Sequence, residues 1–220
     1  MGTQRATRTG AVVVTGASSG IGRACALHLA ALGLQVFAGV RRAEDGAALQ
    51  AASSARLTPM LLDVADETSI RAATDTITAA VGEAGLAGLV NNAGIGVAGP
   101  LEFLPLAEFR TQLEVNVTGQ LAVTQALLPL LRQGRGRIVN MGSIGGRIAA
   151  PFVGPYSASK FALEALTDAL RMELRPWGLH VAIVVIIVIV GGGRGRRSSR
   201  CIRPEAVGQE AAAHPAGHRK

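Results

Sequence analysis

The stretch Thr15-Gly16-Ala17-Ser18-Ser19-Gly20-Ile21-Gly22 decides the fold of this chain, because it joins an apolar run over residues 11–15 to a helical pattern over residues 21–32. Glycines permit a sharp turn and let a backbone approach a pyrophosphate closely. The helix that begins here directs free N–H groups and the positive end of its dipole toward an anion. An ordinary glycine-rich turn is the alternative, but a strand before and a helix after are typical of a phosphate-binding turn.

The same alternation of apolar run and helical pattern continues along the chain, without internal repeats. Near-continuous apolar strands that alternate with helices predict a parallel sheet covered on both faces. Right-handed crossovers then give an α/β, doubly wound (Rossmann) fold, whose ligand crevice lies at the carboxyl ends of the strands. The further predicted strands are 35–40, 58–62, 87–91, 137–141 and 180–190, and the further helices are 44–53, 67–81, 107–131 and 157–174.

Composition predicts one domain with an appendage. The chain has 220 residues, 49% of them hydrophobic, which excludes global disorder. Its two cysteines cannot form a disulfide framework. Much of the net charge of +7 comes from residues 191–220, which contain seven Arg or Lys and only two Glu. We therefore expect a Rossmann domain over residues 1–190 and a basic, disordered or poorly packed tail over residues 191–220, and the basic balance does not by itself imply nucleic-acid binding.

No targeting or membrane segment is expected. The polar N-terminus does not match a signal peptide. The longest apolar run, residues 181–190, has ten residues rich in Val and Ile, whereas a membrane helix needs about 20. Its β-branched content favours a buried strand. We therefore expect a cytoplasmic protein without membrane or nucleic-acid partners.

Further motifs follow the glycine turn at characteristic distances. Asp63-Val64 ends the third predicted strand, and Asn91-Asn92-Ala93-Gly94 ends the fourth. Asn116, Ser143, Tyr156 and Lys160 follow in that order. Over about residues 9–184 this set resembles the short-chain dehydrogenase/reductase family, and residues 140–177 look most like its retinol- and hydroxysteroid-dehydrogenase-like branch. The resemblance implies hydride transfer between a nicotinamide dinucleotide and a lipophilic carbonyl or secondary alcohol, no metal, and a homodimer or homotetramer.

The resemblance also implies which residues hold the dinucleotide. The second predicted strand is followed by Arg41-Arg42, with no acidic residue before Glu44. A guanidinium suits the 2′-phosphate of NADP, whereas an acidic residue usually marks an NAD site. NADP is therefore favoured over NAD, and a solvated loop is the alternative for the two arginines. The expected cofactor-binding residues are Gly16, Ser18, Ser19, Gly20, Ile21, Gly22, Arg41, Asp63, Val64, Asn91, Ala93, Gly94, Tyr156 and Lys160.

Tyr156 and Lys160 are four residues apart, so a helix places them on one face. A free tyrosine has a pKa near 10, and a nearby cation favours the phenolate and lowers that pKa. Tyr156 can then serve as the general acid or base. Ser143, at the end of the fifth strand, can orient the reacting oxygen, or it simply begins a loop. By resemblance, Lys160 holds the nicotinamide ribose, and Asn116 distorts its helix and binds a water that links Lys160 to solvent.

The family pattern fails after the sixth strand. The family continues with a Pro-Gly segment, a substrate loop, a helix and a seventh strand, whereas this chain continues to apolar residues and then to Gly, Arg, Ala, Pro and Ser. We therefore expect six strands, with the seventh missing. Residues from about 185 onward are interpreted as the product of a shifted reading frame or a truncated gene, and the alternative is a basic tail that binds an acidic partner or nucleic acid. The alternatives to an active enzyme are a damaged homologue and a dinucleotide-binding regulatory protein.

Overall fold

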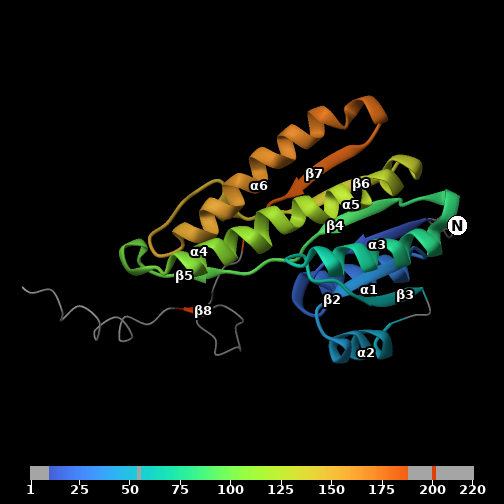
Figure 1. Ribbon diagram of the computed structural model, residues 1–220, viewed down its shortest axis with the longest axis horizontal. Coiled ribbons are helices and arrows are strands. Elements are labelled where there is room, and N and C mark those ends of the chain that lie inside the picture. Colours follow the sequence, from blue (N-terminus) through green and yellow to red (C-terminus); the bar gives the residue numbers. More distant parts are fainter. Residues whose placement is uncertain (1–9, 54–55, 188–199, 202–220) are drawn as a thin grey trace, which may run out of the picture.

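The computed structural model describes residues 10–53, 56–187 and 200–201, and its centre is a six-stranded sheet. The strand order is β3-β2-β1-β4-β6-β7, and every neighbouring pair is parallel (Figure 1). This arrangement confirms the predicted doubly wound α/β fold with six strands. The order reverses between β1 and β4, where such folds form their ligand crevice. The strands are β1 (Ala11–Val14), β2 (Gln35–Val40), β3 (Leu57–Leu61), β4 (Gly88–Asn91), β6 (Arg137–Met141) and β7 (His180–Val184).

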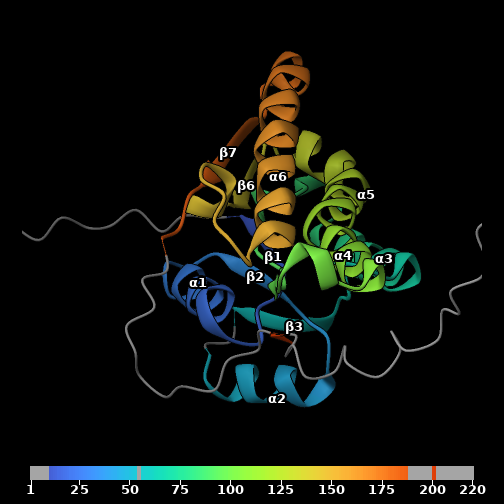
Figure 2. The same ribbon diagram turned by 90° about the vertical axis from the view of Figure 1, so that its left-hand side faces the viewer.

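Helices cover the sheet on both faces and bury two apolar cores (Figure 2). On one face, α1 (Gly20–Ala31) and α2 (Ala43–Ala51) pack against β1, β2 and β3. On the other face, α3 (Glu67–Val81), α5 (Gly119–Gln133) and α6 (Gly154–Glu173) form the larger core. Strands with apolar side chains on both faces, such as β1, are therefore buried throughout.

The predicted helix 107–131 is wrong in one respect, because a π-helical turn interrupts it. The chain forms α4 (Leu106–Leu113), a π turn over Glu114–Thr118, and then α5. Asn116 lies in this turn, and its side-chain amide pairs with the backbone of Ile95 rather than with solvent. A π turn inserts one extra residue into the helix, and such turns are frequent at functional sites. Residues on the two sides of the turn therefore face different parts of the molecule.

The predicted strand 180–190 is also too long, because β7 ends at Val184 and residues 185–187 are not in a strand. Its ladder partner is β6, and the last pair in the register is Met141 with Val184. Beyond that pair the two segments still share a backbone hydrogen bond, from the N–H of Ile144 to the carbonyl of Ile186 (3.0 Å), but they no longer form paired strands. Residues 188–190 lie outside the described residues, as does the predicted boundary between domain and tail at 190–191.

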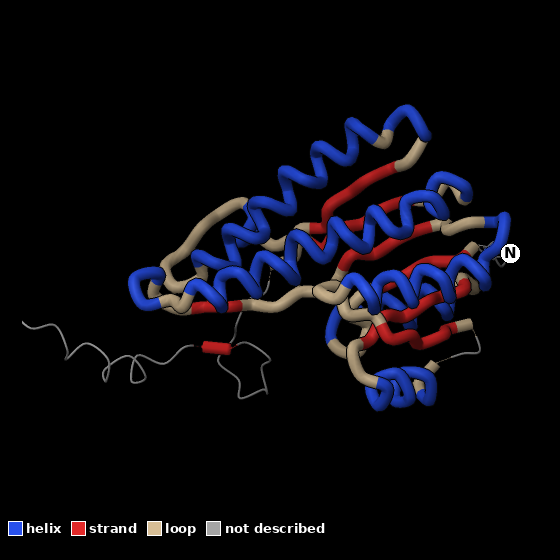
Figure 3. Tube along the Cα trace, in the orientation of Figure 1, coloured by secondary structure: helices blue, strands red, loops and turns tan. Residues whose placement is uncertain are grey.

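After β4 the chain runs as a long loop to the short strand β5 (Val97–Ala98), past the end of the sheet (tan segment in Figure 3). β5 pairs in parallel with β8 (Arg200–Cys201) in a separate two-stranded sheet. β8 is the only part of the predicted tail that the structure describes, and the predicted disorder of the rest lies outside the described residues. The β4–β5 loop is important because it borders the candidate site.

Candidate active site

The glycine turn is fastened to the segment that follows β4. The Thr15 hydroxyl, at the end of β1, accepts hydrogen bonds from the backbone N–H of Asn92 (2.9 Å) and of Ala93 (3.0 Å). In return, the side-chain Nδ2 of Asn92 donates to the carbonyls of Thr15 (3.0 Å) and Gly16 (3.1 Å). Because these bonds join β1 and β4 at the point where the strand order reverses, they fix the floor of the crevice.

Two glycines of the turn leave no room for a side chain. Gly16 has a φ of 63°, and a Cβ there would lie 2.8 Å from the Cα of Ala93. A Cβ at Gly22 would collide with the Asn92 side chain and the Gly16 carbonyl. The turn leads into α1, whose N-cap Ser19 makes no capping hydrogen bond and whose first turn holds no acidic residue. The N-terminus of α1 thus fits a bound anion.

A cavity of about 270 Å³ opens beside this turn. Most of the predicted dinucleotide-binding residues line it, from the glycine turn and from the ends of β2, β3 and β4. The structure thus brings together residues that the sequence separates by more than seventy positions. The predicted residues Gly20, Asn91, Tyr156 and Lys160 do not line this cavity. Its lining consists of Gly16, Ser18, Ser19, Ile21, Gly22, Arg41, Leu62, Asp63, Val64, Asn92, Ala93, Gly94, Ile95 and Val115.

The two neighbouring arginines after β2 differ in their surroundings. Arg42 is paired with Asp45 (3.0 Å) and Glu44 (3.3 Å), and these acidic neighbours raise the pKa of its guanidinium. Arg41 lines the cavity and has no ion-pair partner in the described part of the chain. Arg41 therefore keeps its charge available to an anion in the cavity. Across the cavity, one carboxylate oxygen of Asp63 accepts a hydrogen bond from the N–H of Ala65 (3.0 Å).

The side chain of Asn91 points into the core rather than into the crevice. Its Nδ2 donates to Thr124 Oγ1 and to Asn140 Oδ1, both at 2.9 Å, and Asn140 in turn donates to Thr167 Oγ1 (2.8 Å). These bonds tie β4 and β6 to α5 and α6. Successive side chains at a strand end point to opposite sides, so it is the next residue, Asn92, that reaches the crevice. Sequence reasoning did not single out Asn92, although it belongs to the same motif.

Tyr156 and Lys160 lie one turn apart in α6, close to its N-terminus. The Lys160 Nζ donates to the carbonyl of Met141 (2.7 Å) at the end of β6, and it lies 5.8 Å from the centroid of the Tyr156 ring. Burial lowers the pKa of Lys160 to about 8. A lysine whose pKa lies this near to neutral can exchange a proton at physiological pH.

Ser143 joins the same cluster through Gly145. Ser143 is buried, and its hydroxyl accepts a hydrogen bond from the N–H of Gly145 (3.2 Å). A Cβ added at Gly145 would lie 3.2 Å from Cε1 of Tyr156 and 3.6 Å from Oγ of Ser143. The two side chains therefore face one small space at the carboxyl end of β6.

Asn116 reaches this cluster through Ser159 and not by direct contact with Lys160. Its Oδ1 accepts from the N–H of Ile95 (2.8 Å), and its Nδ2 donates to the Ile95 carbonyl (3.0 Å) and to Ser159 Oγ (3.1 Å). The Ser159 hydroxyl donates to the carbonyl of Tyr156 (2.7 Å). The structure thus brings Asn116, Ser143, Tyr156 and Lys160 to one end of the sheet.

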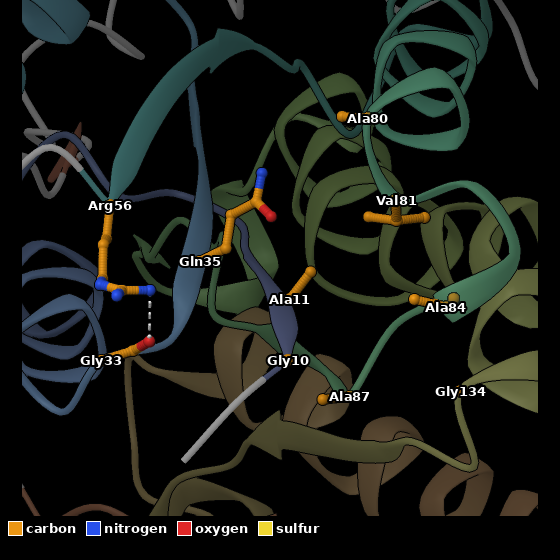
Figure 4. A pocket seen from close by; sticks show the side chains of 11 residues that line it. Gly10, Ala11, Gly33, Gln35, Arg56, Ala80, Val81, Ala84, Ala87 and Gly134 are labelled. Atoms are coloured by element: carbon orange, nitrogen blue, oxygen red, sulfur yellow. Dashed lines mark hydrogen bonds between the residues drawn. The ribbon is translucent and has the colours of Figure 1, made fainter. Parts of the chain in front are cut away.

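A second cavity, of about 570 Å³, lies at the opposite, amino-terminal ends of the strands, where β1 and β2 begin (Figure 4). Ala11, Gln35 and Ala87 border it, and Arg56 spans one side by donating to the carbonyl of Gly33 (3.1 Å). None of the predicted site residues lines this cavity. Across the described residues, no group of three His, Cys, Asp or Glu is placed to hold a metal ion. No helix in that part of the chain has the length and apolar content to span a membrane.

Comparison with known proteins agrees with this geometry. Residues 10–195 match the model of the short chain dehydrogenase family. Mouse (Mus musculus) retinol dehydrogenase 5 is 46% identical over 174 residues, which are 79% of this chain and 54% of that protein. Mouse mitochondrial D-beta-hydroxybutyrate dehydrogenase is 39% identical over 180 residues, covering 79% and 52% of the two chains. This chain therefore spans about half the length of these curated relatives.

Two solved structures have the same fold. A short-chain dehydrogenase from Streptomyces avermitilis superimposes with a TM-score of 0.76 at 36% identity, over 88% of this chain and 72% of that one. Gluconate 5-dehydrogenase from Burkholderia cenocepacia, solved in complex with NADP and tartrate, gives a TM-score of 0.73 at 30% identity, over 82% and 71%. With its family match, its relatives and its fold in agreement, the chain belongs to the short-chain dehydrogenase family and, within it, resembles the retinol dehydrogenases.

Proposed function

We propose that this protein is an oxidoreductase that transfers a hydride between NADP(H) and a lipophilic carbonyl compound or alcohol. Tyr156, Lys160 and Ser143 meet at the carboxyl end of β6, near the glycine turn and its cavity, and this convergence carries the proposal. A dinucleotide fits this turn, because Gly16 and Gly22 let its backbone pack tightly without side chains and the N-terminus of α1 has no capping side chain. The nicotinamide, when bound, supplies or accepts the hydride.

The chain's own residues then manage the oxygen and its proton. Tyr156 gives a proton to the carbonyl oxygen during reduction and takes it back during oxidation, as a general acid and base. The Lys160 ammonium, 5.8 Å from the ring, stabilises the phenolate. Ser143 holds the reacting oxygen with its hydroxyl. Since the pKa of Lys160 is about 8, Lys160 can also return a proton to the phenolate near neutral pH.

The substrate is proposed to be lipophilic because the loops that begin beside Tyr156, at Gly96 and Gly145, carry exposed apolar side chains. Phe103 (50% exposed) and Phe152 (63% exposed) belong to two segments that meet where the N–H of Gly99 donates to the carbonyl of Phe152 (2.7 Å). Phe152 has a φ of 67°, which is unusual for a bulky residue and is typical of a constrained loop. Ile148, on the same loop, is 64% exposed. Relatives named retinol dehydrogenase support this choice.

The preference for NADP rests on Arg41. Replacing Arg41 with Ala should weaken NADPH binding about tenfold, because a charge-assisted hydrogen bond to the 2′-phosphate is lost, and should leave NADH binding unchanged. Fluorescence titration with both dinucleotides measures this. Arg42→Ala is the matched control, since Asp45 and Glu44 already engage that guanidinium. Equal losses for both dinucleotides, or a tighter wild-type complex with NADH, would show the preference to be wrong.

Tyr156→Phe tests the activity itself. With NADP⁺ and a panel of retinol, a hydroxysteroid and 3-hydroxybutyrate, kcat should fall at least about 100-fold, because the acid–base group is lost, while dinucleotide affinity stays the same. Ser157→Ala is the control, since this neighbouring hydroxyl has no hydrogen-bond partner in the described part of the chain. Full activity in Tyr156→Phe would disprove the assigned role.

Dinucleotide binding, turnover and unfolding of the wild type distinguish this activity from two other functions. A dinucleotide-binding regulatory protein would bind NADPH and show no turnover with any alcohol. A damaged homologue would show neither binding nor cooperative unfolding, whereas saturating NADPH should stabilise an intact site by about 2.7 kcal/mol at a hundredfold excess over its dissociation constant. A cytoplasmic location and a homodimer or homotetramer remain part of the proposal.

A further inference from the structure

Gln112 is a buried amide that belongs to no motif of the sequence. It lies in the last turn of α4 with a side chain that is 0% exposed. Its Oε1 accepts from the backbone N–H of Val97 (2.6 Å), and its Nε2 donates to the carbonyl of Ile95 (2.9 Å). A buried amide with partners at both ends fixes the groups that it touches, because any displacement leaves a polar group unsatisfied. Gln112 therefore holds the residues on either side of Gly96.

Gly96 forms one wall of the site around Tyr156. A Cβ at Gly96 would lie 3.9 Å from Cδ2 of Tyr156, and a Cβ at Gly145 would lie 3.2 Å from Cε1 on the other edge of the ring. The ring thus sits between two glycine backbones. Gly145 belongs to the segment after β6, whereas Gly96 belongs to the β4–β5 loop, whose carbonyl and N–H groups are held by Gln112.

Gln112 also reaches the backbone of Tyr156 through Ser159. Its Nε2 lies 3.4 Å from Ser159 Oγ, which also accepts from Asn116 Nδ2 (3.1 Å) and donates to the Tyr156 carbonyl (2.7 Å). Every hydrogen-bonding group of Gln112 is therefore directed at the wall beside the Tyr156 ring or at the turn of α6 that carries it. A residue that only stabilised the core would not require this convergence.

We propose that Gln112 is a positioning residue, which sets the place of the Tyr156 ring by holding the Gly96 wall and, through Ser159, the first turn of α6. The catalytic consequence of this role rests on the proposed function, but the positioning itself does not. When Gln112 is replaced, the wall and the turn lose a shared support, and the ring moves relative to the Lys160 ammonium, 5.8 Å away. A phenol less well aligned with this cation loses stabilisation of its charged form.

Tyr156 is the only tyrosine of the chain, so its ionisation can be followed directly. Phenolate absorbance is titrated in the full chain, with and without saturating NADP⁺, for the wild type, Gln112→Met and Ser159→Ala. Methionine matches the shape of glutamine and removes all three side-chain hydrogen bonds. The titration midpoint should rise in both variants, and their double variant should shift it by less than the sum, since both act on one network.

Thr167→Val is the matched control. Thr167 is fully buried in α6 and bonded to Asn140, away from the turn that carries Tyr156. It should lower the unfolding temperature without moving the phenol midpoint. In turnover assays, Gln112→Met should lower kcat about tenfold or more with dinucleotide affinity nearly unchanged, because small misplacements of a catalytic group are costly.

The outcomes separate the two proposals. A wild-type midpoint in both Gln112→Met and Ser159→Ala, or an equal shift in Thr167→Val, overturns the positioning role. Should Gln112→Met fail to fold, Ser159→Ala alone decides, because the route to the Tyr156 carbonyl passes through its hydroxyl. A raised midpoint in a chain that turns over no alcohol supports the positioning role while the proposed activity fails.

Discussion

Lys160 lies where burial disfavours its charge, and this affects stability as well as chemistry. Burial lowers its pKa from 10.5 to about 8, so the folded chain binds fewer protons at this site than the unfolded chain between those values. The free energy of unfolding must therefore rise with pH over that window. This sign is opposite to that of a lysine in a salt bridge, whose contribution is lost as the pH rises.

The size of this effect can be measured by comparison with Lys160→Met. Between pH 7.5 and 10, the free energy of unfolding of the wild type should rise by about 2 kcal/mol relative to the variant. This gain comes from the difference between the pKa of Lys160 in the folded and in the unfolded chain. Urea unfolding of both chains at the two pH values gives this difference. Both chains should carry Tyr156→Phe, so that ionisation of the phenol does not couple to that of the lysine. A difference independent of pH would mean that Lys160 is hydrated rather than buried.

Side-chain direction limits what can be predicted at the scale of single residues. Tyr156 and Lys160 could be placed together because helical spacing alone puts them on one face. The adjacent Asn91 and Asn92 could not be told apart, since only the register of β4 decides which one faces the crevice. Gln112 gives no signal at all, because its partners are the N–H of Val97 and the carbonyl of Ile95, which tertiary structure brings to it.

At the scale of elements, the π turn and α5 bring the helix close to the end of β3. Gly119, the first residue of α5, packs against the segment after β3, and a Cβ there would lie 2.5 Å from the Val64 carbonyl oxygen and 3.0 Å from that of Glu114. Val64 also lines the cavity of about 270 Å³ beside the glycine turn. The start of α5 therefore supports one side of this cavity.

Gly119→Ala should push α5 away from Val64. Because both obstructing atoms are backbone, the helix itself must shift, at a cost of about 1–3 kcal/mol that is typical of overpacking. NADPH affinity should fall with it. Urea unfolding and dinucleotide titration measure both effects, and Gly88→Ala is the control, since its Cβ would meet the nearest atom at 3.4 Å. If the two variants lose equal stability, the close approach at Gly119 has no energetic role.

Element boundaries could be predicted well where a local pattern sets them. Five strands are predicted to within one residue at each end, because their apolar runs are bounded by turns. The π turn was not predictable, since the apolar pattern continues on both sides of it. The sixth strand was predicted too long because β6, its partner, ends at Met141, and apolar sequence does not tell where a partner ends.

At the scale of the whole molecule, β7 lies at one edge of the six-stranded sheet. It pairs in parallel with β6 on one side, and no other strand of the described residues pairs with its other side. Along β7, the buried Val181 and half-buried Ile183 alternate with exposed residues, among them Val184 at 45% exposure. An apolar edge strand with free backbone groups is a template for pairing with another chain. Concentrated protein should therefore associate through this edge.

Val184→Lys tests that expectation, because a charge on an edge strand opposes pairing without disturbing the ladder on the other side. Association, followed by sedimentation velocity over a range of protein concentrations, should begin at severalfold higher concentration in this variant, with unchanged NADPH affinity. Met172→Lys is the control, since it adds the same charge at an exposed apolar residue of α6. An equal effect of both variants would assign the change to net charge. Unchanged association in Val184→Lys would show that β7 is not the contact, and that any oligomer forms through the helices instead.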